Sequence, residues 1–157
     1  MTSEIVELKE ASKIEIISLM DNTVDFLSTN RRKEVQKFPH WAHEYTDLPF
    51  AEHGFSMLLR VSNREKTCTI LYDTGNSPNG VVMNAKSMDI DLREVSYVVL
   101  SHGHYDHFGG LEAIVKVINK NDLPIIAHES MFKPRGTANS IGAVSYTHLT
   151  LPTNREV

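Results

Sequence analysis

The stretch Ser101–Gly110, S-H-G-H-Y-D-H-F-G-G, places three histidines and one aspartate within six residues. It directly follows Tyr97–Leu100 (Y-V-V-L), a continuous apolar run typical of a strand buried on both faces. Polar side chains crowded at the end of a buried strand lose solvation energy unless they pair or bind a metal ion. The stretch therefore predicts a metal site at the carboxyl end of a strand.

The spacing of these four side chains divides them into two pairs. His102 and His104 are two residues apart, so in an extended loop both point the same way, toward one metal ion. Asp106 and His107 are adjacent and are expected to reach a second position. Imidazole and carboxylate ligands suit Zn²⁺, and also Mn²⁺ or Fe²⁺. The pattern thus predicts two divalent metal ions, with zinc as the first expectation.

Hydrophobic periodicity predicts regular elements on both sides of this stretch. Expected strands are Ile14–Met20, Phe55–Val61, Thr67–Tyr72, Tyr97–Leu100 and Pro124–Ala127, and expected helices are Val81–Met88 and Leu111–Asn119. The turn S-N-R-E-K at residues 62–66 joins the second and third strands into a hairpin. Gly109 and Gly110 are expected to let the last helix start close to the metal ions. A hairpin followed by strand–helix–strand predicts a layered α/β fold.

Length and composition restrict the class of protein. The 157 residues are enough for one domain, and the net charge of −4 without a basic block argues against a nucleic-acid partner. Cys68 is the only cysteine, so no disulfide forms within the chain. The N-terminus lacks an apolar signal segment, and no apolar run is long enough to span a bilayer. We expect a cytoplasmic protein with no membrane partner.

The histidine stretch also matches a known signature. H-x-H-x-D-H after an apolar strand resembles the metallo-β-lactamase superfamily, and L-Y-D-T-G at Leu71–Gly75 is similar to a strand end of that superfamily. Ala51–Leu58 (A-E-H-G-F-S-M-L) and Asn84-Ala85 resemble one branch, the proteins similar to 7,8-dihydropterin-6-methyl-4-(β-D-ribofuranosyl)-aminobenzene-5′-phosphate synthase. The resemblance covers roughly residues 14–135. It implies an α/β fold of the αββα sandwich type, of which this chain holds the N-terminal half only.

The resemblance implies roles for single residues. His102 and His104 would bind the first metal ion, and Asp106 and His107 the second, with Asp106 also orienting the attacking water. Asp73 either forms hydrogen bonds near the metal loop or is a plain strand-end turn residue. Four further residues either border the substrate pocket or are ordinary surface and turn residues: Glu52, His53, Asp21 and Asn22.

The implied ligand set is incomplete in this chain. A catalytic zinc usually has three protein ligands plus water, whereas four residues shared by two ions supply two each. Beyond the motif the sequence has only His128, expected to be a structural or pocket residue, and His148. His148 lies in a tail (V-S-Y-T-H-L-T-L-P-T-N-R-E-V) that resembles translated bases of a sequencing-library adaptor. We predict that residues 1–143 are the N-terminal part of a metallo-β-lactamase-like domain and that residues 144–157 are a non-native tail.

Two functions are compatible with these expectations. In the first, the parent protein is a binuclear metal-dependent hydrolase in which a metal-bound hydroxide attacks an ester or phosphoester. Its partner would be a small-molecule substrate, and the branch resemblance favours a phosphorylated one and a synthase-like reaction. In the second, the truncated chain is a non-catalytic fragment or remnant that binds metal weakly. The sequence predicts no oligomeric state.

Overall fold

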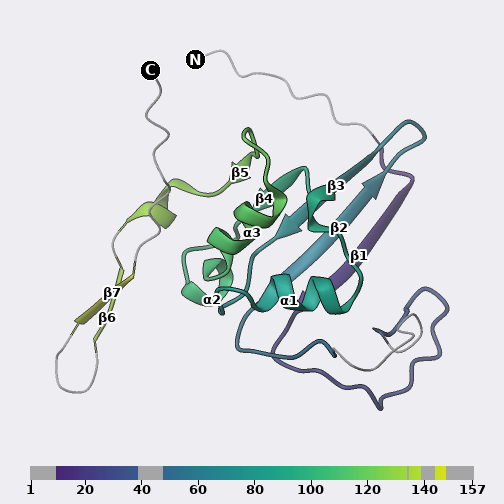
Figure 1. Ribbon diagram of the computed structural model, residues 1–157, viewed down its shortest axis with the longest axis horizontal. Coiled ribbons are helices and arrows are strands. Elements are labelled where there is room, and N and C mark those ends of the chain that lie inside the picture. The colour runs from purple at the N-terminus through teal and green to yellow at the C-terminus, as the bar shows by residue number, and fades with distance from the viewer. Residues whose placement is uncertain (1–9, 39–47, 134, 139–143, 148–157) are drawn as a thin grey trace.

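A five-stranded mixed sheet organises the computed structural model, which describes residues 10–38, 48–133, 135–138 and 144–147 (Figure 1). Its strands are β1 (Lys13–Met20), β2 (Ser56–Ser62), β3 (Thr67–Tyr72), β4 (Tyr97–Val99) and β5 (Ile125–Ile126), in that spatial order. β1, β2 and β3 pair antiparallel, and β4 and β5 run parallel to β3. Two further strands, β6 (Arg135–Ala138) and β7 (Val144–Thr147), pair with each other in a separate two-stranded sheet.

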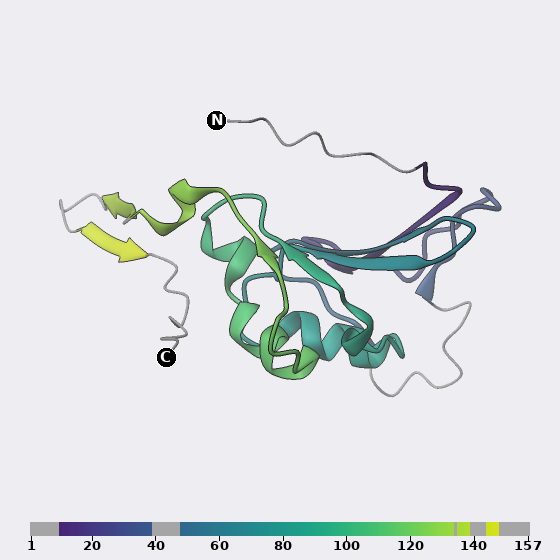
Figure 2. The same ribbon diagram turned by 90° about the horizontal axis from the view of Figure 1, so that it is seen from above.

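Helices cover one face of the large sheet. They are α1 (Gly80–Ser87), α2 (Tyr105–Phe108) and α3 (Leu111–Ile118), and two 3-10 turns complete the helical elements, η2 (Leu92–Glu94) and η3 (Glu129–Phe132). Figure 2 shows these teal and green helices on one side of the strands. Every predicted strand and helix is present, with ends that differ by no more than one residue. No helix in the described part of the chain is long and apolar enough to cross a bilayer.

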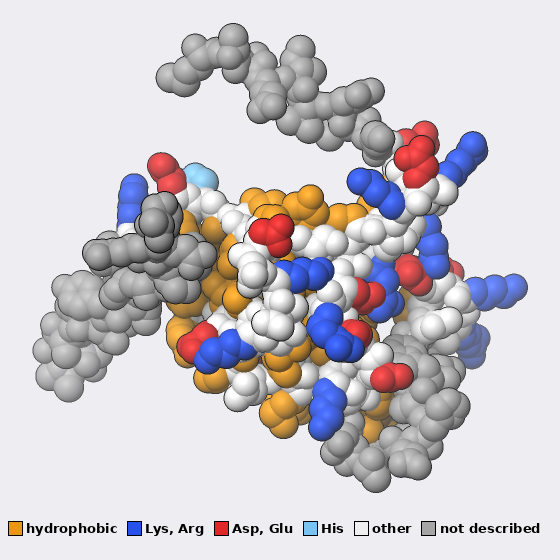
Figure 3. Space-filling view, turned by 45° about the horizontal axis from the view of Figure 1, so that its top comes forward, with side chains coloured by type: hydrophobic (Ala, Val, Ile, Leu, Met, Phe, Trp, Pro, Cys, Tyr) orange, Lys and Arg blue, Asp and Glu red, His pale blue; other side chains and the backbone are white. Residues whose placement is uncertain are grey.

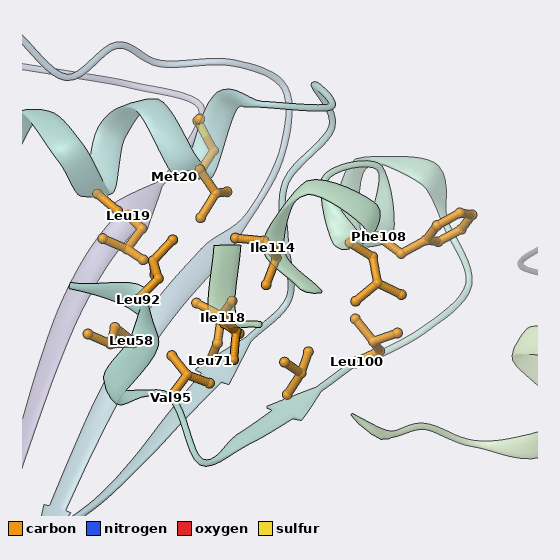
Figure 4. Close-up of a cluster of buried hydrophobic side chains, with 14 of the residues drawn as sticks. Leu19, Met20, Leu58, Leu71, Leu92, Val95, Leu100, Phe108, Ile114 and Ile118 are labelled. Atoms are coloured by element: carbon orange, nitrogen blue, oxygen red, sulfur yellow. The ribbon is translucent and has the colours of Figure 1, made fainter. Parts of the chain in front are cut away.

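The hydrophobic core lies between the sheet and these helices (Figure 4). Leu58, Leu71 and Val98 on adjacent strands point toward the helices and are fully buried. α3 meets them because its apolar residues recur at helical spacing, and Leu111, Ile114 and Ile118 are its buried residues. The helix then ends at Asn119, whose left-handed backbone (φ 52°) closes the last turn.

The opposite face of the sheet, here called the outer face, is also apolar. Alternate residues of each strand point to it, and the strand register aligns them in rows across the sheet. Its residues are Ile14, Ile16, Ser18, Met57, Leu59, Val61, Cys68, Ile70, Tyr72, Tyr97, Val99 and Ile126. Both faces of the sheet therefore carry apolar side chains, and an apolar outer face is typical of a sheet packed on both sides.

Gly109 and Gly110 lead directly into α3, and the closeness of this helix to metal ions stays a prediction. The two glycines also allow a close approach of two backbone segments. Residues 105–108 of the histidine stretch form a one-turn helix, α2, and the two glycines join α2 to α3. A Cβ atom at Gly109 would lie 2.0 Å from the backbone oxygen of Asn76, and one at Gly110 would lie 2.3 Å from that of Thr74. The glycines are needed because this backbone crosses the loop after β3 at close range.

Replacing Gly109 by alanine is expected to destabilise the chain by about 1–3 kcal/mol, because a rigid backbone atom occupies the place of the new methyl group. Gly80→Ala is the matched control. Its methyl group would lie 3.0 Å from Met20 Cε and 3.1 Å from Glu52 Oε1, both at the ends of side chains that can shift. Urea unfolding followed by circular dichroism measures both changes, and equal losses would contradict this account.

Candidate metal centre

A buried carboxylate joins the end of β3 to the histidine stretch. Asp73 is fully buried and has a left-handed backbone (φ 58°), a conformation that aspartate tolerates. Its carboxylate accepts hydrogen bonds from the backbone N–H and the hydroxyl of Ser101, both at 2.7 Å, and from Nδ1 of His107 at 2.7 Å. The Asp73 N–H donates to the backbone oxygen of Val99 (2.8 Å), so β3, β4 and the motif meet at this one residue.

The nitrogen and oxygen atoms of the histidine motif (His102–His107) that could bind a metal ion lie in two pairs. With Nδ1 of His107 bound by Asp73, Nε2 is its free ring nitrogen, and it lies 3.4 Å from Oδ2 of Asp106. Ser101 Oγ holds Nδ1 of His102 at 2.9 Å, and Nε2 of His102 lies 2.9 Å from Nδ1 of His104. Two ligands of one tetrahedral zinc are about 3.3 Å apart, given metal–ligand bonds of about 2.0–2.1 Å.

The donor types and spacings fit two divalent ions, but neither ion would have a complete set of ligands. The rings of His102 and His107 also approach each other, with centroids 4.1 Å apart, so the two pairs are neighbours. In the described residues, no three His, Cys, Asp or Glu side chains form a group that could hold a metal ion. Since a catalytic zinc usually takes three protein ligands, each pair requires at least one more donor.

The electrostatics of the motif favour neutral imidazole at His102. Burial lowers the pKa of the His102 ring below its ordinary value, and the neighbouring rings of His107 and His104 lower it further. The carboxylates of Asp73 and Asp106 act in the opposite direction. Neutral imidazole is the form that binds a metal ion.

Glu52, expected to border a pocket or lie on the surface, is bonded to the loop after β3. Its carboxylate accepts hydrogen bonds from the backbone N–H groups of Asn76 (2.8 Å) and Ser77 (3.0 Å) and from the Ser77 hydroxyl. This loop is the one that the α2–α3 junction crosses. Glu52 therefore supports the backbone beside the motif.

The other three candidate pocket residues occupy different places. His53 is exposed, and its Nε2 lies 3.5 Å from Oδ2 of Asp106, so it faces the motif from the segment before β2. Asn22 accepts a hydrogen bond from the Gly54 N–H (3.2 Å) and so holds that segment. The Asp21 carboxylate accepts a hydrogen bond from the Asn22 N–H (2.7 Å). Asp21 also lines an open groove of about 900 Å³ along β1, and no residue of the histidine motif lines this groove.

Sequence reasoning assigned no role to two residues that shape the centre. Ser101 binds Asp73 and His102, and its only signal is a hydroxyl directly before the first histidine. Phe55 donates its N–H to the Asp106 backbone oxygen (3.2 Å), and its ring lies 6.2 Å from that of His107. His128, by contrast, lies outside the centre and caps η3, where its Nδ1 accepts a hydrogen bond from the Ser130 N–H (3.2 Å).

Comparison with protein families identifies the superfamily of this chain. The family model described as the metallo-beta-lactamase superfamily matches residues 50–152, which include the whole motif and the Asp73 loop. The chain belongs to the metallo-β-lactamase superfamily. Residues 148–157, and His148 with them, lie outside the described part of the structure, and the non-native tail stays a prediction.

Two curated proteins are similar in sequence to part of this chain. It is 40% identical over 89 residues to the 7,8-dihydropterin-6-methyl-4-(beta-D-ribofuranosyl)-aminobenzene-5′-phosphate synthase of Methanocaldococcus jannaschii, covering 57% of this chain and 30% of that protein. It is 32% identical over 74 residues to a UPF0173 metal-dependent hydrolase of Staphylococcus carnosus, covering 47% and 28%. The chain thus spans under a third of the length of these relatives.

Solved structures give weaker similarities. MEM-A1, a subclass B3 metallo-beta-lactamase from a soil metagenome library, has 19% identity and a TM-score of 0.38, with 63% of this chain and 42% of that chain covered. SMB-1, a metallo-beta-lactamase in complex with mercaptoacetic acid, has 23% identity and a TM-score of 0.36, covering 54% and 37%.

Asp73→Asn is expected to weaken metal binding by about 10–100-fold. The asparagine side chain can donate a hydrogen bond to Nδ1 of His107, which Asp73 cannot. Nδ1 then accepts and the ring proton moves to Nε2, the nitrogen that should bind the metal ion. Asp91→Asn, at the exposed start of η2, is the matched control. Zinc competition against a chromogenic chelator measures both affinities, and unchanged affinity in Asp73→Asn would contradict this role.

In the metal-free chain, we expect His102 to titrate below the ordinary histidine pKa of 6.5. Because the unfolded chain then takes up its proton first, the free energy of unfolding falls as the pH drops through that value. Histidine ring NMR in the presence of a chelator measures the titration. His107→Gln should raise the His102 pKa only in part, since burial is the larger cause. A pKa at or above the ordinary value would contradict the analysis.

Proposed function

We propose that this chain is part of a metal-dependent hydrolase that uses His102, His104, Asp106 and His107 to hold two divalent ions. The observation that carries the proposal is the pairing of donor atoms, His102 Nε2 with His104 Nδ1 and Asp106 Oδ2 with His107 Nε2. Membership of the metallo-β-lactamase superfamily supports it. Nitrogen and carboxylate donors favour Zn²⁺, and Mn²⁺ or Fe²⁺ are the alternatives.

When bound, such ions supply a nucleophile at neutral pH and stabilise developing negative charge. The chain's own residues position this chemistry. Asp73 fixes the tautomer and orientation of His107 through Nδ1. The Asp106 carboxylate, which faces the His107 and His53 rings, can accept a hydrogen bond from the attacking water and orient it.

The proposed substrate is a small phosphorylated molecule. The Methanocaldococcus jannaschii relative is named as the synthase of a 5′-phosphate compound, and the Staphylococcus carnosus relative as a metal-dependent hydrolase. Hydrolysis is the broader class that agrees with both the centre and the superfamily. A synthase-like transfer on a phosphorylated substrate is the narrower alternative. Figure 3 shows acidic and basic side chains interspersed on the face in view, without one large patch of either charge.

A second candidate function is non-catalytic metal binding by this chain alone. It is favoured by the lack of a third donor for either pair within the described residues. In this case a longer protein would carry the activity, and residues 144–157 would be the non-native tail. Long-read sequencing of the source locus across the codon for Ala143 tests that boundary. A genome that encodes Val144–Val157 and a stop would contradict it.

Metal titration distinguishes the two candidates. If the centre holds two ions tightly, isothermal titration should give two zinc equivalents per chain. Substitution of His102 or His104 by alanine should remove one equivalent, and substitution of Asp106 or His107 should remove the other. Weak uptake of a single ion would favour the non-catalytic fragment. Phosphoesterase activity that survives exhaustive chelation would contradict the metal-dependent proposal.

A further inference from the structure

His53 is an exposed imidazole beside the second donor pair. Its side chain is 81% exposed, and its Nε2 lies 3.5 Å from Oδ2 of Asp106. The same carboxylate oxygen lies 3.4 Å from Nε2 of His107, so both rings approach one atom. Within the described residues this approach is the one polar contact of the His53 ring, and it is longer than a normal hydrogen bond. The ring nitrogens are therefore available to a bound molecule.

Backbone contacts hold the segment that carries His53 against the motif. The Gly54 N–H donates to the side-chain oxygen of Asn22 (3.2 Å), and the Phe55 N–H donates to the backbone oxygen of Asp106 (3.2 Å). A Cβ atom at Gly54 would lie 3.2 Å from that same Asp106 oxygen, so only a short side chain fits at this crossing. These contacts fix where His53 emerges, which is directly beside the Asp106 carboxylate.

The contacts of the His53 ring give it no structural role among the described residues. The hydrophobic core does not include it, whereas the carboxylates of Asp73 and Glu52 near the motif each accept three hydrogen bonds. In their described positions, His53, Asp106 and His107 do not form a group that could hold a metal ion. An exposed side chain on a loop that a folded scaffold positions is typical of a residue that binds a ligand.

The nearest hydrogen-bond donors to the pair are already in use. The Ser101 hydroxyl and Nδ1 of His107 both donate to the Asp73 carboxylate. The carboxylates of Asp73 and Asp106 are acceptors and cannot bind an anion themselves. His53 differs from these side chains because an imidazole has at least one N–H donor in either protonation state, and its ring makes no hydrogen bond within the described residues.

We propose that His53 donates a hydrogen bond to a phosphoryl oxygen of the substrate bound at this centre. A phosphoryl group has several oxygens, and those that do not contact metal ions require donors from the protein. The inference rests on the proposed function, since bound ions must first offset the negative charge of Asp73 and Asp106. It assigns His53 to substrate binding and leaves the set of metal ligands unchanged.

Isothermal titration of the zinc-loaded chain with inorganic phosphate and, separately, with phenyl phosphate tests the proposal. His53→Ala should weaken the binding of both compounds by about 10-fold or more, the loss expected for one hydrogen bond to a charged group. His53→Gln keeps an N–H donor and should restore most of the affinity. Lys66→Ala is the control, because it removes an exposed donor from the turn between β2 and β3 and should leave both affinities unchanged.

The zinc content of each variant separates this inference from the proposed function. His53→Ala should bind as many zinc equivalents as the unaltered chain, because His53 contacts the substrate and not the ions. A chain that takes up no zinc would contradict the proposed function and this inference together. Normal zinc uptake with unchanged phosphate binding in His53→Ala would overturn this inference alone.

Other outcomes would also overturn the role of His53. Loss of a zinc equivalent in His53→Ala would make it a metal ligand, and equal weakening in Lys66→Ala would mean that phosphate is held by the general charge of the surface. A zinc-loaded chain that binds neither compound, or weaker binding of inorganic phosphate alone, would contradict a contact with a phosphorylated substrate. Circular dichroism checks that each variant is folded, and His53→Phe, which keeps a ring without a donor, replaces His53→Ala if that variant is not.

Discussion

The buried carboxylate of Asp73 is the interaction on which the centre depends. A charge without solvent is costly unless hydrogen bonds satisfy it, and three short bonds from Ser101 and His107 do so here. Each bond has a second consequence. The Ser101 bonds fix the start of the motif, and the His107 bond leaves that ring's Nε2 as the free nitrogen. The same contacts that stabilise the strand end thus set the geometry of the proposed metal ligands.

Close backbone packing holds this arrangement in place. The Thr74 N–H donates to the His107 backbone oxygen (2.8 Å), and the glycine junction between α2 and α3 passes directly over the same loop. Glu52 binds the loop's next residues, Asn76 and Ser77. Because these partners come from three separate segments of the chain, residue 52, residues 74–77 and residues 107–110, the centre depends on tertiary contacts as well as on local sequence.

Much of this could be predicted from the sequence, for identifiable reasons. The strands and α3 follow from hydrophobic periodicity, which depends only on nearby residues. That His102 lies beside His104, and Asp106 beside His107, follows from their spacing, and their role as ligands stays a prediction. What could not be predicted depends on contacts between distant segments. The role of Ser101 depends on its hydrogen bond to Asp73, which is distant in the sequence. The Asn84 side chain donates to the backbone oxygens of Leu19 and Phe50, and no residue near Asn84 indicates these bonds. The place of Gly109 likewise depends on a loop more than thirty residues earlier.

The centre and the sheet are incomplete in parallel ways. Each donor pair lacks a third ligand within the described residues, and the outer face lacks a covering layer there.

The central claim is that Asp73 prepares two adjacent ligand pairs. A crystal structure of the zinc-loaded chain, with anomalous scattering recorded at the zinc edge, tests it most directly. The account predicts one peak between His102 Nε2 and His104 Nδ1 and another between Asp106 Oδ2 and His107 Nε2. Zinc bound elsewhere, or a His107 that binds zinc through Nδ1 with its bond to Asp73 broken, would contradict it.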